Sequence, residues 1–144
     1  PESNGGLELC VRYTASDEGP VNPSEMVQGE EFTAVIIATN YSATGNFSNL
    51  ALTYLIPSGW EIINDRLTGT EENDGRYDRL DIRDDRVLLY FDLPMNTYKK
   101  FRIRLRAAYE GDYILPSASC ECMYDRSVNA CTASERCKVT RLGE

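Results

Sequence analysis

The sequence predicts an all-β protein, an antiparallel β-sandwich of about nine short strands with little or no helix. Apolar and polar residues alternate in several runs, as in strands that bury one face. Turn-forming Gly, Pro, Asn and Asp residues separate the runs, and none of the runs keeps a helical period for the roughly ten residues that a helix needs. Many short strands joined by turns are typical of a sandwich, and 144 residues suffice for one domain with a substantial core.

The first part of the chain contains three predicted strands. Residues 7–13 alternate, and residues 32–39 are apolar on both faces, which favours a central strand. A loop with Gly, Pro and Asn separates them, and residues 24–29 are too short a run for a helix. The third strand is predicted at residues 50–56, after a polar loop at 40–49. That loop contains two Asn-x-Ser glycosylation sequons, at Asn40 and Asn46.

A tight turn is predicted at residues 57–59, where Pro and Gly lie close together in the sequence. Pro57 suits the second position of a type I turn and Gly59 the fourth. Trp60 then opens another strand, at residues 60–64. We expect its indole to fill the core, although a sole Trp beside a turn could also stack on a sugar.

A charged hairpin is predicted at residues 81–93, with its turn at Asp84 and Asp85. The alternative is that Asp81, Asp84 and Asp85 are paired acids for catalysis or metal binding, but the sequence offers no His partner and no Gly to shape such a site. The acidic segment 70–75 lacks the ligand spacing of an EF-hand, so we expect a solvated loop there.

The clearest strand of the chain is residues 101–110. Its polar positions include Arg102, Arg104 and Arg106, which we interpret as a solvent-facing row rather than a phosphate contact. Gly111 then allows a turn or bulge before further extended structure up to Asp125.

The end of the chain has a weaker pattern. Residues 126–134 show no period, so a loop with room for one helical turn is predicted. Residues 136–141 form the last predicted strand.

The composition argues for a binding or structural module rather than an enzyme. The formal net charge of -8 argues against nucleic acid and anionic membranes as partners, and no apolar run is long enough for membrane insertion. Histidine is absent, which removes Ser-His-Asp and Cys-His catalysis and the commonest metal ligand. We therefore expect no catalytic residue, no metal and no cofactor. The chain opens at Pro1 without an initiator Met or signal peptide, so we expect residues 1–144 to be one domain of a longer chain.

The cysteines allow more than one interpretation. Their odd number leaves at least one outside any pairing within the chain. A four-thiolate zinc site is conceivable, but the Cys120-Glu121-Cys122 spacing is not the usual zinc knuckle. Small buried core residues are the simpler expectation. The five positions are Cys10, Cys120, Cys122, Cys131 and Cys137.

Several segments, taken in order, resemble one family. In this sequence they are residues 49–53 leading to Ile-Pro-Ser-Gly-Trp-Glu-Ile at 56–62, then 81–87, 90–92, Gly-Asp-Tyr-Ile-Leu-Pro at 111–116, and Cys-Glu-Cys-Met-Tyr-Asp at 120–125. Together they resemble the C-terminal macroglobulin-like domain of bacterial alpha-2-macroglobulins. The resemblance runs from about Leu7 to Val139.

The resemblance implies a non-enzymatic module of a large protease trap, periplasmic or in the cell envelope, with any lipid anchor in the upstream part of the parent chain. Target proteases would meet the full-length protein. It also implies that this domain packs against a neighbouring thioester-type domain and shields the thioester with Met123 and Tyr124, the turn being fixed by Asp125. The thioester's own Cys-x-Glu-Gln motif is not in this sequence, and Cys122 stands where the family usually has a small residue such as Ala.

Two alternatives remain open from the residues. A surface adhesion or carbohydrate-binding sandwich would expose Trp60 beside the 40–49 loop. An enzyme would need the acids near Asp84 to converge in a pocket that raises their proton affinity. Met123 and Tyr124 could also simply fill the core at a strand end.

Overall fold

Strands are the only regular secondary structure in the part of the chain that the structure describes. This computed structural model describes residues 2–4, 6–15, 19, 21–23, 25–41, 45–63, 79–83, 85–123, 125–132 and 135–140. None of these residues is helical, so none belongs to a helix able to span a membrane. The strands are β1 (Glu2–Asn4), β2 (Leu7–Thr14), β3 (Met26–Val27), β4 (Glu31–Asn40), β5 (Phe47–Leu55), β6 (Trp60–Ile62), β7 (Arg79–Arg83), β8 (Arg86–Leu93), β9 (Tyr98–Ala107), β10 (Gly111–Leu115), β11 (Ser119–Cys122), β12 (Asp125–Cys131) and β13 (Glu135–Thr140).

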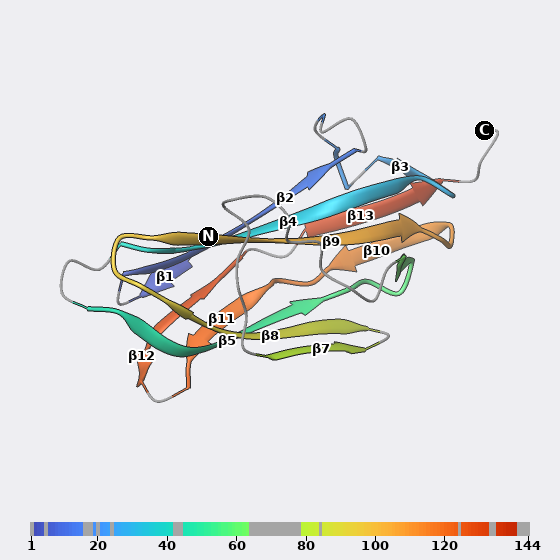
Figure 1. Ribbon diagram of the computed structural model, residues 1–144. Coiled ribbons are helices and arrows are strands. Elements are labelled where there is room, and N and C mark those ends of the chain that lie inside the picture. Colours follow the sequence, from blue (N-terminus) through green and yellow to red (C-terminus); the bar gives the residue numbers. More distant parts are fainter. Residues whose placement is uncertain are drawn as a thin grey trace.

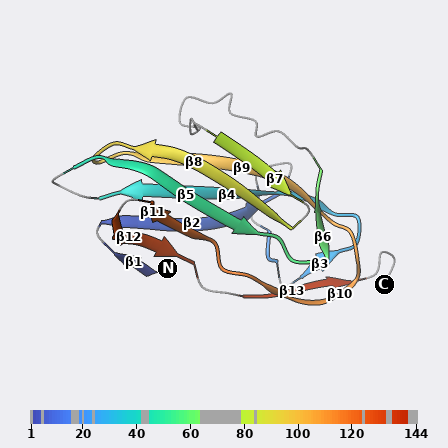
Figure 2. The same ribbon diagram turned by 90° about the horizontal axis from the view of Figure 1, so that it is seen from below.

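The strands form three sheets that enclose one core. One sheet has six strands in the order β1-β12-β11-β5-β8-β7, and the second has four in the order β2-β4-β9-β6. Figure 1 shows these two sheets as facing layers, and Figure 2 shows the third sheet, β10-β13-β3, toward their right-hand end. The pairings of the described strands are antiparallel except for β3 with β13. The predicted all-β sandwich is confirmed.

The predicted central strand lies in the middle of the four-stranded sheet. β4 pairs with β2 on one side and with β9 on the other. Its side chains alternate between buried and half-buried, so that Phe32, Ala34 and Ile36 point into the core. The opposite face of the core comes from β5 and β8, where Leu52 and Leu89 are buried. Apolar alternation in the sequence therefore specifies which face of each strand is inside.

A long two-stranded ribbon connects the six-stranded sheet with the three-stranded one. β10 runs along β13, and β11 runs along β12. The pairing of Ser119 with Cys131 continues the register of Leu115 with Glu135, because each is four residues further along its own strand. Between the two sheets, Thr132 N donates to Ala118 O (2.9 Å) and Ala118 N donates to Thr132 Oγ1 (2.9 Å). The ribbon thus passes from one sheet to the other without losing register, and it ends at the turn between β11 and β12.

Two local predictions were wrong. Residues 126–134 were predicted as a loop, but β12 occupies Asp125–Cys131 and pairs with both β1 and β11. Only Val128 and Ala130 of this strand are buried apolar residues, so tertiary pairing stabilises it rather than a strong local pattern. The turn after β5 is also shifted by one residue, because Trp60 N donates to Pro57 O (3.1 Å), which makes Pro57 the first position.

Candidate functional site

The three residues singled out as the candidate site lie at the turn between β11 and β12 and at the first position of β12. β11 ends at Cys122, Met123 follows in the turn, and β12 begins at Asp125. In Figure 1 the turn lies at the lower left end of the sandwich. Tyr124 and the side chain of Asp125 lie outside the described residues, so their predicted roles stay predictions.

The backbone of Met123 is held against a distortion in the neighbouring strand β5. Met123 N donates to Asn49 O (3.0 Å), and the register of β5 with β8 shifts between Phe47 and Leu50. Asn49 has a φ of 58°, a left-handed conformation that Asn adopts more readily than most residues. Its N–H donates to Asp92 Oδ1 (2.9 Å), and a carboxylate acceptor strengthens such a bond. The sequence analysis did not identify Asn49 or Asp92 as supports of the turn.

A buried thiol lies directly beneath the turn. Cys122 Sγ donates to Ser48 O (3.3 Å), and the pairing of β11 with β12 shifts between Glu121 and Cys122. Two residues earlier, Cys120 points to the same buried side, and burial raises the pKa of its thiol to about 12. Cys120 is therefore a protonated core thiol at neutral pH and not a nucleophile.

Met123 itself is not a core residue. Its side chain is 51% exposed, whereas Cys122 and Leu50 beside it are buried. A large unbranched apolar side chain is thus presented to solvent by a backbone with defined hydrogen bonds. This geometry suits a contact surface, because Met adapts its shape to whatever packs on it.

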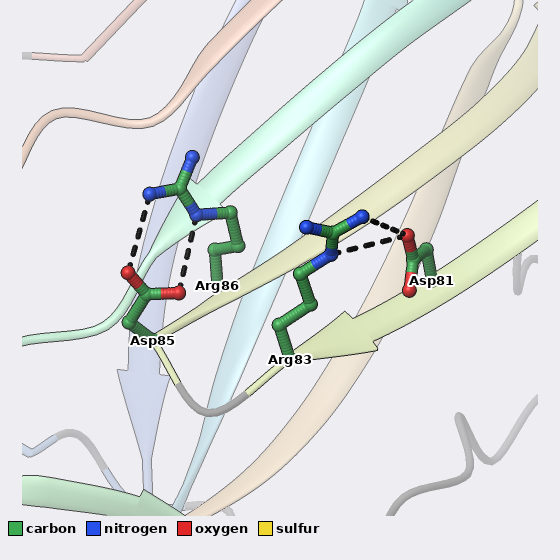
Figure 3. Close-up of polar contacts among 4 residues, drawn as sticks. All are labelled: Asp81, Arg83, Asp85 and Arg86. Atoms are coloured by element: carbon green, nitrogen blue, oxygen red, sulfur yellow. Dashed lines mark hydrogen bonds and ion pairs between the residues drawn. The ribbon is translucent and has the colours of Figure 1, made fainter.

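Among the described acids of the β7–β8 hairpin, Asp81 and Asp85 each pair with an arginine. Arg83 pairs with Arg86 across the hairpin, as predicted, and Figure 3 shows the two ion pairs beside the turn. Arg83 Nη2 lies 3.1 Å from Asp81 Oδ2, and Arg86 Nε lies 3.2 Å from Asp85 Oδ1. The hydrogen bonds from Arg86 lower the pKa of Asp85, which is the opposite of what an acid catalyst at neutral pH needs. Asp84 lies outside the described residues.

Trp60 is buried, so it cannot serve as a sugar-stacking platform. The indole is 3% exposed and packs edge-on against Phe32, with ring centroids 4.7 Å apart, and against Tyr13. Its Nε1 has no hydrogen-bond partner of normal geometry among the described residues. The nearby polar group is the Cys137 thiol, whose pKa burial raises to about 11 against a smaller lowering effect of the indole. The core interpretation of Trp60 is confirmed, and the carbohydrate-binding alternative loses its platform.

The predicted zinc and glycosylation alternatives also gain no support. Within the described residues, no three His, Cys, Asp or Glu side chains gather closely enough to hold a metal ion, and segment 70–75 lies outside them. Asn40 is fully buried, and its Nδ2 donates to Leu93 O (3.0 Å) and Gly45 O (3.1 Å), so the first sequon is inaccessible in the folded protein. Asn46 is exposed, and its Oδ1 accepts a hydrogen bond from Met95 N (2.9 Å).

Known proteins resemble this chain over most of its length. Residues 6–126 match the family described as the bacterial alpha-2-macroglobulin MG10 domain. An alpha-2-macroglobulin homolog of Yersinia pestis is 26% identical over 150 residues, and an alpha-2-macroglobulin of Pasteurella multocida is 29% identical over 133 residues. These matches cover 88% and 90% of this chain but only 7% of each relative.

Solved structures agree on the fold. Salmonella alpha-2-macroglobulin reacted with methylamine matches with a TM-score of 0.83 and 22% identity, over 97% of this chain and 10% of that one. The native conformation of Escherichia coli alpha-2-macroglobulin matches with a TM-score of 0.83 and 18% identity, over 96% and 10%. The chain belongs to the bacterial alpha-2-macroglobulin MG10 domain family.

Proposed function

We propose that this chain is the C-terminal macroglobulin module of a bacterial alpha-2-macroglobulin-type protease inhibitor and that Met123 and Tyr124 shield a thioester in a neighbouring domain. The module is non-enzymatic, and target proteases meet the full-length protein in the periplasm or cell envelope. The observation that carries the proposal is the half-exposed Met123 on a turn that Asn49 and Asp92 hold in place.

The proposed role follows from the chemistry of a thioester. This activated acyl group is lost to water and to small amines, so it persists only in a dry pocket. A cover must fill an irregular shape and withdraw later without unfolding its own domain. Met suits this because its chain is flexible, and Tyr adds a broad apolar ring with a hydroxyl that can find a partner. Since Met123 lies outside the core, its side chain can move while the sandwich stays folded.

The test is methylamine uptake by the full-length, uncleaved protein. The similar Salmonella protein has been solved after reaction with methylamine, so this small amine is a suitable probe. We expect the Met123→Ala, Tyr124→Ala double variant to take up methylamine faster than the wild type, because the pocket loses its cover. Ile114→Ala is the matched control, since Ile114 is another exposed apolar side chain, on β10. Equally slow uptake by the double variant and the wild type would show that the pair is not the cover.

A further inference from the structure

The outer face of the four-stranded sheet concentrates positive charge, although the chain as a whole has a net charge of -8. In β2, β4 and β9 alternate side chains are buried in the core, so the side chains between them face outward. Figure 1 shows these strands as the layer above β5, β8 and β7. The outward cations are Arg12 on β2 and Lys100, Arg102, Arg104 and Arg106 on β9.

The acids of this face lie near its two ends. Arg104 Nη2 lies 3.5 Å from Glu31 Oε1, and Arg106 forms an ion pair with Glu61 at the same end. Glu8 is the other acid that the described strands place on this face, and the register of β2 with β4 puts it at the opposite end. The middle of the face therefore carries cations without an acid in the same cross-strand rows. These cations are Arg12, Lys100 and Arg102.

The cations in the middle of the face flank apolar side chains of β4. Val35 pairs with Arg12 on one side and with Arg102 on the other, and Ile37 pairs with Lys100 in the next outward row. Neighbouring strands lie about 4.8 Å apart, so the backbones of Arg12 and Arg102 are separated by about 10 Å across Val35. Val35 and Ile37 are half-buried although they point away from the core. The middle of the face is thus an apolar strip with cations along both sides, which we call the basic strip.

A hollow of about 220 Å³ adjoins the basic strip. Its lining includes Arg102, Arg104, Thr14 and Thr33, whose guanidinium and hydroxyl groups are hydrogen-bond donors. Glu31 also lines it and binds Arg104 through its carboxylate. The fork of N–H groups on a guanidinium matches the two oxygens of a carboxylate, so a second carboxylate suits the Arg102 side of the hollow.

We propose that the basic strip binds an extended acidic segment of a protein partner. Carboxylates of the segment bind Arg12, Lys100 and Arg102, and its apolar side chains pack on Val35 and Ile37. Arginines around an apolar centre are typical of protein–protein interfaces, where Arg is enriched, and opposite charge on the partner selects it over other proteins.

The proposal goes beyond the cover function, because it concerns another face of the molecule and does not depend on the β11–β12 turn. Nucleic acid fits the strip less well than a short acidic segment does. A long polyanion extends past the strip and meets the field of a chain with a net charge of -8, which repels it. A peptide segment places its few carboxylates on the cations and avoids this repulsion.

The first test is binding of a short capped peptide in which Glu alternates with Val to the 144-residue chain, followed by calorimetry. At low salt this peptide should bind at least about tenfold more tightly than the same peptide with Gln in place of Glu, and added salt should weaken it. Equal affinity for the two peptides would overturn the proposal. Tighter binding of a single-stranded DNA oligonucleotide of the same charge would also overturn it, because the occupant would then be a phosphate polymer.

Variants separate the basic strip from the charge of the whole chain. The Arg12→Gln, Arg102→Gln double variant should bind the Glu peptide at least about tenfold more weakly, because the row across Val35 loses both guanidinium groups. The Arg83→Gln, Arg86→Gln double variant removes the same charge from the β7–β8 hairpin and should bind normally. Equal weakening by both would overturn the proposal. Arg12→Glu against Arg83→Glu repeats the comparison at two exposed positions if a double variant fails to fold.

A thiol on the same face locates the bound peptide. Cys10 is half-buried and pairs with Ile37, whereas the half-buried Cys131 lies on β12 of the other large sheet. Saturation with the Glu peptide should slow the alkylation of Cys10 by iodoacetamide and leave Cys131 unchanged. Unchanged alkylation of Cys10 would overturn the proposal. Self-association of the chain that protects Cys10 without peptide would overturn it as well, because the occupant would then be a second copy.

Discussion

The two ends of the sandwich differ in charge although the same strands lead into both. One end, which we call the uncharged end, consists of the described residues 41, 45–49, 94–98 and 123, none of which is Asp, Glu, Lys or Arg. There, amide side chains and backbone groups bond to one another, the neighbouring Asp92 carboxylate accepts from Asn49 N, and apolar side chains face outward. At the opposite end, which we call the charged end, acids and arginines form ion pairs, two of them between neighbouring strands and two between residues close in the sequence. These pairs are Asp81–Arg83, Asp85–Arg86, Glu31–Arg104 and Glu61–Arg106. Because loops at a sandwich end carry little of the core, their composition differs between the two ends without any change of the fold.

The largest expected effect lies in the core beside the charged end. Trp60→Ala should lower the free energy of unfolding by about 3–5 kcal/mol, because it removes a buried indole that packs on Phe32 and Tyr13. Chemical denaturation of the isolated chain would measure this loss. The result would sharpen the comparison by showing that the charged end is stabilised by the core beneath it and not by its ion pairs. A variant that unfolds at the same denaturant concentration as the wild type would place Trp60 outside the core.

A smaller loss is expected where the core meets the uncharged end. Asn40→Ala should cost about 1–3 kcal/mol, because it leaves the Leu93 carbonyl without the buried Asn40 Nδ2 donor. Asn46→Ala is the matched control, since the exposed Asn46 gives up a single acceptor to Met95 N. Thermal unfolding of both variants would compare them. Equal losses would mean that the loops of the uncharged end, and not the buried amide, hold this end together.

The smallest effect is expected from the ion pairs of the charged end. Arg86 lowers the pKa of Asp85 below its ordinary value of 3.8, so the pair stabilises the fold above that pH. This contribution is lost as the pH falls through the lowered pKa, because the unfolded state then binds the proton more tightly. Both side chains are solvent-exposed, so Asp85→Asn should change the unfolding midpoint little at neutral pH and not at all in strong acid. A large loss at neutral pH would show that the charged end is a structural element and would break the comparison.

The sequence predicted most of the fold because alternation identifies a strand without knowledge of its partners. Residues 32–39 form a strand with the predicted buried face. In the stretch 101–110 the prediction holds up to Ala107, where β9 ends, but it was wrong for Tyr109, which alternation placed on the buried face and which is exposed. β12 could not be predicted in this way, because it owes its conformation to β1 and β11 on either side. β1 and β3 are only two or three residues long, too short to show a period.

The candidate site, like the fold, was predicted only in part from the sequence. Met123 was identified through the family resemblance, and the structure places its side chain in solvent. Asn49 and Asp92, which hold the turn, were missed because their hydrogen bond joins residues 43 positions apart. The positive φ of Asn49 has only a weak signal in the sequence, a single Asn at the end of a polar segment.

The most direct test of the proposed cover is the oxidation rate of the three methionines. Hydrogen peroxide converts exposed Met to the sulfoxide, and mass spectrometry of peptides can follow Met26, Met95 and Met123 separately. In the isolated chain, Met95 and Met123 should oxidise quickly and the fully buried Met26 slowly. In the full-length protein, Met123 should oxidise slowly, because we propose that it packs on the neighbouring domain. Oxidation of Met123 at the same fast rate in both proteins would contradict the account, since the β11–β12 turn would then face water.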